Sequence, residues 1–140
     1  MALQKQITNL RTGHANEYWR LTAISIDALS GHLQLVLSGY ARNTARQSGR
    51  LPDDSREWMF GPDAFGGIVQ APAVGATLYD VNAIASYNLI RNTRRPLPNG
   101  SVVGESGATL PTGEFVPMAN IEGWPDAPTI PSEFADALDV

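Results

Sequence analysis

The sequence predicts a mainly β protein of the α+β class: a small antiparallel β-sheet or sandwich with one helix near residues 77–92 and an extended C-terminal arm. Three observations support this prediction. Leu33, Leu35 and Leu37 recur at every second position, which is typical of a half-buried strand. Apolar residues recur at helical spacing within the predicted helix. Residues 96–131 contain seven of the ten prolines, a composition typical of extended chain.

The first sixty residues predict four strands and one antiparallel hairpin. The expected strands span residues 4–10, 18–26, 32–40 and 56–60. A turn containing Gly31, which can adopt a positive φ, joins the second and third strands into a hairpin. In the fourth strand, alternation places Trp58 and Phe60 on one face and Met59 on the other. The polar residues 41–55 predict a loop that is exposed or covered by a partner.

The helix is expected to mark the end of the β-rich domain. Thr77 or Asp80 can cap its N-terminus, and Pro96 prevents its continuation. We therefore expect a β-rich domain over residues 1–95 and an arm over residues 96–140. The expected apolar face of the helix comprises Leu78, Val81, Ile84, Ala85, Tyr87, Asn88 and Leu89.

The arm is expected to work through contact with a neighbour. Short strands are expected at residues 101–103 and 114–116, and the other apolar residues come singly between turn-forming residues. A segment of this composition is not expected to bury a core of its own, so it must lie against its own domain or another subunit. Isolated apolar anchors on an extended chain favour another subunit. The candidate anchors are Phe115, Ile121, Trp124, Ile130 and Phe134.

Charge is unevenly distributed along the chain. Residues 1–100 contain all ten basic residues against seven acidic ones, whereas residues 101–140 contain seven acidic residues and no basic one. This pattern favours either a solvated acidic tail or a tail that docks on a basic neighbour. Nine of the ten basic residues are arginines, which favours a protein interface over nucleic acid. Arg42, Arg46 and Arg50 are the candidate contacts of the 41–55 loop.

No pattern in the sequence indicates catalysis, and we expect that the chain is not an enzyme. It lacks cysteine, and His14 and His32 lack the spacing of a metal site. A turn after Pro52 explains the adjacent acids Asp53 and Asp54. Phosphate-binding glycine loops and nucleophile motifs do not occur. We therefore expect no cofactor, metal or catalytic residue, and no apolar run is long enough to span a membrane.

Several segments share a pattern with one group of proteins. The chain opens Met-Ala-Leu-Gln-Lys-Gln-Ile-Thr, and Tyr18-Trp19-Arg20-Leu21 leads through a turn at Asp27 into residues 32–40. The polar residues 40–46, the helical residues 79–90 and the ending Pro-Ser-Glu-Phe-Ala-Asp-Ala at 131–137 follow. In these segments the chain resembles small tail or baseplate-associated virion proteins of tailed bacteriophages. It departs from them in the Pro/Gly-rich stretch that separates the helix from the ending.

The resemblance implies a structural component of a phage tail tip, baseplate or fibre-attachment collar. Such a protein is synthesised in the bacterial host cytoplasm and becomes part of the virion. Its expected partners are other virion proteins and further copies of itself, with neither nucleic acid nor membrane. A capsid decoration or head–tail joining protein stays open as an alternative. A glycan- or ligand-binding module also stays open; it would need Trp19, Trp58 and Trp124 exposed together, whereas Trp19 and Trp58 are expected in the core.

Overall fold

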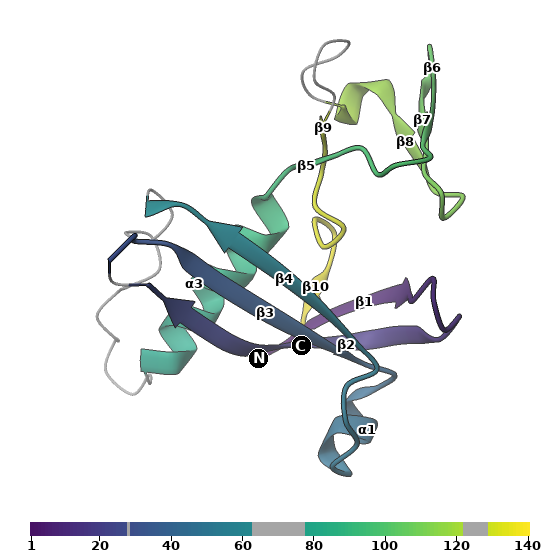
Figure 1. Cartoon of the computed structure of the whole chain (residues 1–140). Coiled ribbons are helices and arrows are strands. Elements are labelled where there is room, and N and C mark those ends of the chain that lie inside the picture. Colours follow the sequence, from purple (N-terminus) through teal and green to yellow (C-terminus); the bar gives the residue numbers. More distant parts are fainter. Residues whose placement is uncertain (28, 63–77, 122–128) are drawn as a thin grey trace. The chain divides into compact units, whose positions relative to one another are not determined.

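The computed structural model describes residues 1–27, 29–62, 78–121 and 129–140, and of residues 78–81 it describes only the backbone. The chain divides into two compact units, one formed by Met1–Ile90 with Asp136–Val140 and the other by Arg91–Ala135. Strands predominate in both units (Figure 1), which confirms the predicted mainly β, α+β class. Of the described helices, none is long and apolar enough to cross a membrane.

The first unit is built on one antiparallel sheet. Its strands, in spatial order, are β10 (Leu138–Asp139), β1 (Leu3–Thr8), β2 (Ala15–Ile26), β3 (Leu33–Tyr40) and β4 (Asp54–Phe60). β2 and β3 pair antiparallel, which confirms the predicted hairpin. The helix α3 (Leu78–Asn92) runs across one face of the sheet (Figure 1). The described strands of this unit therefore form an open sheet covered by a helix, and not a sandwich.

One face of the sheet holds the core of the first unit. Leu33 and Leu35 are fully buried there. The register places Phe60 opposite Leu33 and Trp58 opposite Leu35, so both aromatic residues share this face. Met59 points to the other face and is 62% exposed. The predicted alternation in β4 is confirmed, because successive side chains of a strand point to opposite faces.

The buried face of α3 differs from the predicted one. Ala83, Tyr87 and Ile90 are buried, whereas Ile84 is 45% exposed and Asn88 is exposed. Positions 83, 87 and 90 share one side of a helix. Tyr87 is buried as predicted, but the buried face also takes in the polar Ser86, so it is displaced from the stripe that the apolar residues alone indicated. Outside the described side chains lie the expected cap and face residues Thr77, Leu78, Asp80 and Val81.

Tyr87 of α3 hydrogen-bonds the backbone of the sheet. The register between β2 and β3 shifts between Leu21 and Ala23, a β-bulge. The Leu21 N–H donates a hydrogen bond to the Tyr87 hydroxyl at 2.8 Å. The hydroxyl in turn donates to the Met1 carbonyl oxygen at 3.3 Å. One side chain of α3 thus bridges a backbone donor of β2 and a backbone acceptor at the start of the chain.

Tyr87→Phe is expected to lower the free energy of unfolding of the first unit by about 1–3 kcal/mol, because it leaves the buried Leu21 N–H without its acceptor. Urea unfolding followed by tryptophan fluorescence measures the change. Tyr40→Phe is the matched control, because Tyr40 is a buried tyrosine of the same unit whose hydroxyl makes no hydrogen bond among the described residues. A loss of stability no larger in Tyr87→Phe than in the control would contradict the role of the hydroxyl.

Trp19 lies against the backbone of Gly39 in the neighbouring strand. The indole is fully buried, as expected, and its Nε1 donates a hydrogen bond to the Lys5 carbonyl oxygen at 3.0 Å. A Cβ built on Gly39 would come within 2.7 Å of the indole ring. The Arg56 guanidinium lies over the same ring, 5.4 Å from its centroid. Trp58, also expected in the core, is partly buried.

The last residues of the chain belong to the sheet of the first unit. β10 pairs antiparallel with β1, and Ala2 and Val140 exchange two backbone hydrogen bonds of 2.8 and 3.0 Å. Lys5 donates a hydrogen bond to the Asp136 carboxylate, and this bond lowers the pKa of that carboxyl group. The structure therefore draws the boundary differently from the expected division into residues 1–95 and an arm over 96–140.

The second unit contains two small antiparallel sheets. β5 (Arg95–Pro96) pairs with β9 (Thr129–Ile130). β6 (Val102–Gly104), β7 (Gly107–Thr109) and β8 (Phe115–Pro117) form a three-stranded sheet, and the short 3-10 helix η1 (Met118–Asn120) follows. The strands expected at residues 101–103 and 114–116 are confirmed within one residue. β7 was not predicted, because Gly107-Ala108-Thr109 has too few apolar residues to show alternation.

The second unit buries a small core of its own. The core comprises Ala108, Leu110, Val116, Ile121 and Ile130, and Leu97 packs against it. The expectation that this segment cannot bury a core is therefore wrong. Its apolar residues are far apart in sequence, but the hairpin turns bring them to one side of the three-stranded sheet. Arg94 adds a cross-link within the unit, because its guanidinium donates hydrogen bonds to the carbonyl oxygens of Asn120 and Thr129.

The basic and acidic parts of the sequence do not coincide with the two compact units. The first unit contains seven basic and nine acidic residues, and the second contains three basic and five acidic residues. Charge is segregated locally instead. Residues 41–52 contain three arginines and no acidic residue, whereas residues 96–121 contain Glu105 and Glu114 and no basic residue.

Candidate functional site: an arginine pocket

The segment between β3 and β4 is folded, not an irregular loop. It contains the helix α1 (Asn43–Gln47), which the sequence did not predict. A helix of one turn is unstable alone. Here the Arg50 N–H donates to the Ala45 carbonyl oxygen at 3.1 Å, and the Asp53 N–H donates to the Gly39 carbonyl oxygen at 2.9 Å. The first bond joins the residues after α1 to the helix, and the second joins the end of the segment to β3. Together they hold α1 at one end of the sheet.

Tyr18 and Arg46 connect α1 to the face of the sheet opposite the core. Tyr18 pairs with Tyr40 across β2 and β3, and their ring centroids are 6.4 Å apart. Both rings are buried in a small cluster with Ala2. The Arg46 guanidinium carbon lies 5.8 Å from the Tyr18 ring centroid, a cation–π contact worth roughly 0.5–1 kcal/mol at an exposed site.

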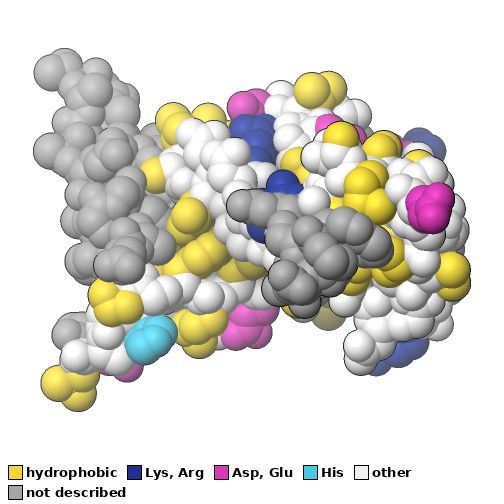
Figure 2. Space-filling view, turned by 90° about the horizontal axis from the view of Figure 1, so that it is seen from above, with side chains coloured by type: hydrophobic (Ala, Val, Ile, Leu, Met, Phe, Trp, Pro, Cys, Tyr) yellow, Lys and Arg dark blue, Asp and Glu magenta, His cyan; other side chains and the backbone are white. Residues whose placement is uncertain are grey.

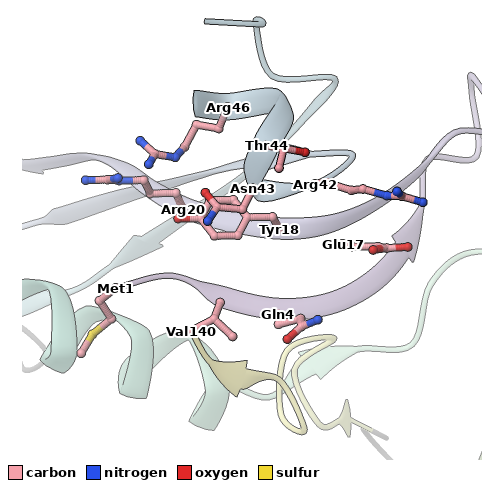
Figure 3. Close-up of a pocket in the computed structure, with 10 residues that line it drawn as sticks. All are labelled: Met1, Gln4, Glu17, Tyr18, Arg20, Arg42, Asn43, Thr44, Arg46 and Val140. Atoms are coloured by element: carbon pink, nitrogen blue, oxygen red, sulfur yellow. The ribbon is translucent and has the colours of Figure 1, made fainter. Parts of the chain in front are cut away.

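A pocket of about 650 Å³ opens around this contact, and we call it the arginine pocket. Its functional side chains are Arg20, Arg42, Arg46, Tyr18 and Glu17. Figure 3 shows Arg20 and Arg46 extending toward one end of the pocket in this view, and Arg42 toward the end at which Glu17 lies. The pocket thus presents cationic groups around an aromatic ring.

The arginine pocket is unbalanced in charge. It contains three guanidinium groups and one acidic side chain. Within the described part of the chain, neither Arg42 nor Arg46 has a carboxylate within ion-pair distance, and the buried Nε of Arg46 has no hydrogen-bond partner. A buried donor without an acceptor costs free energy. A ligand with a carboxylate or similar anion would satisfy these donors, and a guanidinium can hold such a group through two hydrogen bonds.

The sequence predicted only part of this site. The structure brings the predicted Arg42 and Arg46 together, and places the exposed Arg50 with Arg42 at a neighbouring hollow of about 420 Å³. It adds Tyr18 and Arg20, which the predicted interface did not include. The sequence could have indicated that Tyr18 and Arg20 lie together, because residues two apart in a strand share a face.

The predicted anchors of the C-terminal segment have different outcomes. Ile121 and Ile130 are buried in the core of the second unit, and Phe134 is fully buried. We therefore withdraw these three as interface anchors, since a side chain already buried in its own chain is not free to contact a partner. Phe115 is 51% exposed and stays a candidate. Trp124 lies outside the described residues.

The described residues show neither a tryptophan platform nor a metal-binding cluster. The burial of Trp19 removes one of the three aromatic rings that a sugar-stacking platform required. His14 and His32 are exposed, and no group of three or more potential metal ligands occurs in the described part of the chain.

Comparison with known protein families, curated proteins and solved structures gives no match to this chain.

Proposed function

We propose that this chain is a structural protein of a tailed-bacteriophage virion, in the tail tip, baseplate or fibre-attachment region, and that it acts by oligomeric docking. The arginine pocket is the observation that supports a docking role most directly. It lies on a sheet whose other face is fixed by a fully buried core, so its groups are held on a rigid scaffold. The resemblance of the sequence to small tail proteins supports the virion as the setting.

The chemistry of the pocket suits recognition of protein groups. Arginine and tyrosine are enriched at protein interfaces and at the few residues that contribute most binding energy. The exposed apolar residues add contact area in the second unit, where Val102 is 70% exposed and Phe115 51%. In Figure 2, hydrophobic side chains lie at the surface next to acidic ones. Docking through such surfaces needs no cofactor, metal or nucleic acid.

Mass spectrometry of purified particles tests the location. Particles produced from the genome that encodes this chain are expected to contain it at a fixed stoichiometry to the major tail protein. Antibody labelling in electron micrographs is expected to mark the tail and not the capsid. Absence of the chain from particles would refute a virion role. Label on the capsid surface or at the head–tail junction would instead establish the alternative, a decoration or joining protein.

A further inference from the structure

We propose that the arginine pocket of one copy accepts the acidic, apolar edge of the second unit of another copy, so that copies associate head to tail. This inference rests on the proposed docking function and names its partner surface. It commits to a second copy of this chain as the occupant. Two surfaces of the chain, one in each unit, are complementary in charge.

The receiving surface has three arginines and one acidic side chain, Glu17. Arg46 lies over the Tyr18 ring with a buried Nε that has no partner among the described residues. Arg42 is exposed and is part of no ion pair within the described chain. Residues 41–52 contain no acidic residue that could neutralise them. The pocket therefore favours a partner with a carboxylate, and the ring favours an apolar group beside it.

The three-stranded sheet of the second unit offers both an apolar surface and carboxylates. The register aligns Val102, Thr109 and Phe115 across the sheet, so they share one face. The opposite face packs on the core through Ala108 and Val116. The first face is left exposed, with Val102 at 70% and Phe115 at 51%. The two exposed apolar side chains on this face offer contact area to a partner.

Two acidic residues lie at the ends of the strands of this sheet. Glu114 precedes Phe115 directly, and Glu105 lies in the turn between β6 and β7; both are exposed. No basic residue occurs between residues 96 and 121. The sheet thus combines an exposed aromatic residue with exposed carboxylates at its ends, and the pocket combines a tyrosine ring with guanidinium groups. The pocket of about 650 Å³ is within the range of roughly 300–1,000 Å³ that accommodates such a group.

The two surfaces are different patches of the same chain, so their contact is heterologous. A heterologous contact repeats from copy to copy and forms a ring if the rotation closes, or a filament if it does not. Each copy contributes one pocket and one acidic edge. Because charged groups take part, association is expected to weaken as salt screens them.

A charge exchange between the two surfaces tests the proposal. We expect the purified wild-type chain to be oligomeric by light scattering at low ionic strength. Arg46→Glu and Glu114→Arg should each weaken association roughly tenfold or more, because each places like charges in contact. Mixing the two variants should restore assembly, since the reversed pocket of one then faces the reversed edge of the other. Arg42→Glu is a second pocket variant, because Arg42 is exposed and its side chain has no hydrogen bond in the described structure.

Arg11→Glu is the matched control, because Arg11 is exposed and lies outside the pocket. It changes the net charge as Arg46→Glu does and should assemble like the wild type. A wild-type chain that stays monomeric, pocket variants that assemble normally, or a mixture that fails to associate would each overturn the proposal. None of these outcomes changes whether particles contain the chain, so the virion assignment is tested independently.

Discussion

Gly107→Ala is expected to destabilise the second unit by about 3 kcal/mol or more, because the added methyl group has no space and the backbone conformation does not suit it. A Cβ at this position would lie 2.1 Å from the Val116 carbonyl oxygen and 2.9 Å from the Phe115 ring. The nearest obstacle is backbone, which cannot rotate away. The φ angle of 151° is one that residues with side chains rarely adopt. Separation of β7 from β8 is the expected result.

Hydrogen exchange of the backbone amides measures this change where it occurs. In Gly107→Ala, amides of β6, β7 and β8 should exchange faster, while amides of the β2–β3 pairing keep their protection. Gly113→Ala is the matched control, because Gly113 has a positive φ of 85° but open space around its Cβ position. Gly113→Ala should lower the free energy of unfolding by only about 1–2 kcal/mol, which is the cost of placing a side chain on a residue with positive φ. Equal effects of the two substitutions would show that the close approach to Val116 is not required.

Gly39→Ala is expected to destabilise the first unit by about 1–3 kcal/mol, the usual cost of overpacking a filled core. The added Cβ would lie 2.7 to 3.0 Å from three atoms of the Trp19 ring. That ring is fully buried and its Nε1 is hydrogen-bonded to the Lys5 carbonyl oxygen, so it cannot move without losing contacts. Displacing it would also disturb the contact with Arg56.

Urea unfolding monitored by tryptophan fluorescence measures the effect of Gly39→Ala. The matched control is Gly61→Ala, because a Cβ at Gly61 meets nothing within 4 Å and its φ is not positive. The control should be nearly neutral. A second variant, Gly39→Ala with Trp19→Phe, should recover part of the loss if the clash with the indole is its cause, relative to Trp19→Phe alone. Additive losses in the double variant would contradict that cause.

The core of the first unit was predictable because its residues are periodic. Leu33, Leu35 and Leu37 alternate over a whole strand, and the helix repeats over fifteen residues. A long strand or helix buries one face against a neighbour, so its apolar residues recur at a regular spacing that can be recognised in the sequence. The face of the helix was predicted less well, because the small residues Ala83 and Ser86 are buried against the sheet whereas the apolar Ile84 is exposed.

The arginine pocket was only half predictable. The recurrence of Arg42 and Arg46 in a polar segment indicated a contact surface, and the structure places both in one pocket. Tyr18 and Arg20 come from a strand more than twenty residues earlier. They join the site because β2 pairs with β3 in one register and because α1 folds back over the sheet. A register is a property of the pair of strands, not of either sequence alone.

The sequence by itself determined the β-hairpin, the helix, the class of the fold and the arginine-rich character of residues 41–52. Only the tertiary structure decided that residues 91–135 enclose their own core, that residues 136–140 return to the first sheet, and which arginines share a pocket. The physical reason is the range of the interactions. Alternation and helical spacing act between near neighbours in sequence, whereas two-residue strands and isolated apolar side chains gain stability only from partners that are distant in the chain.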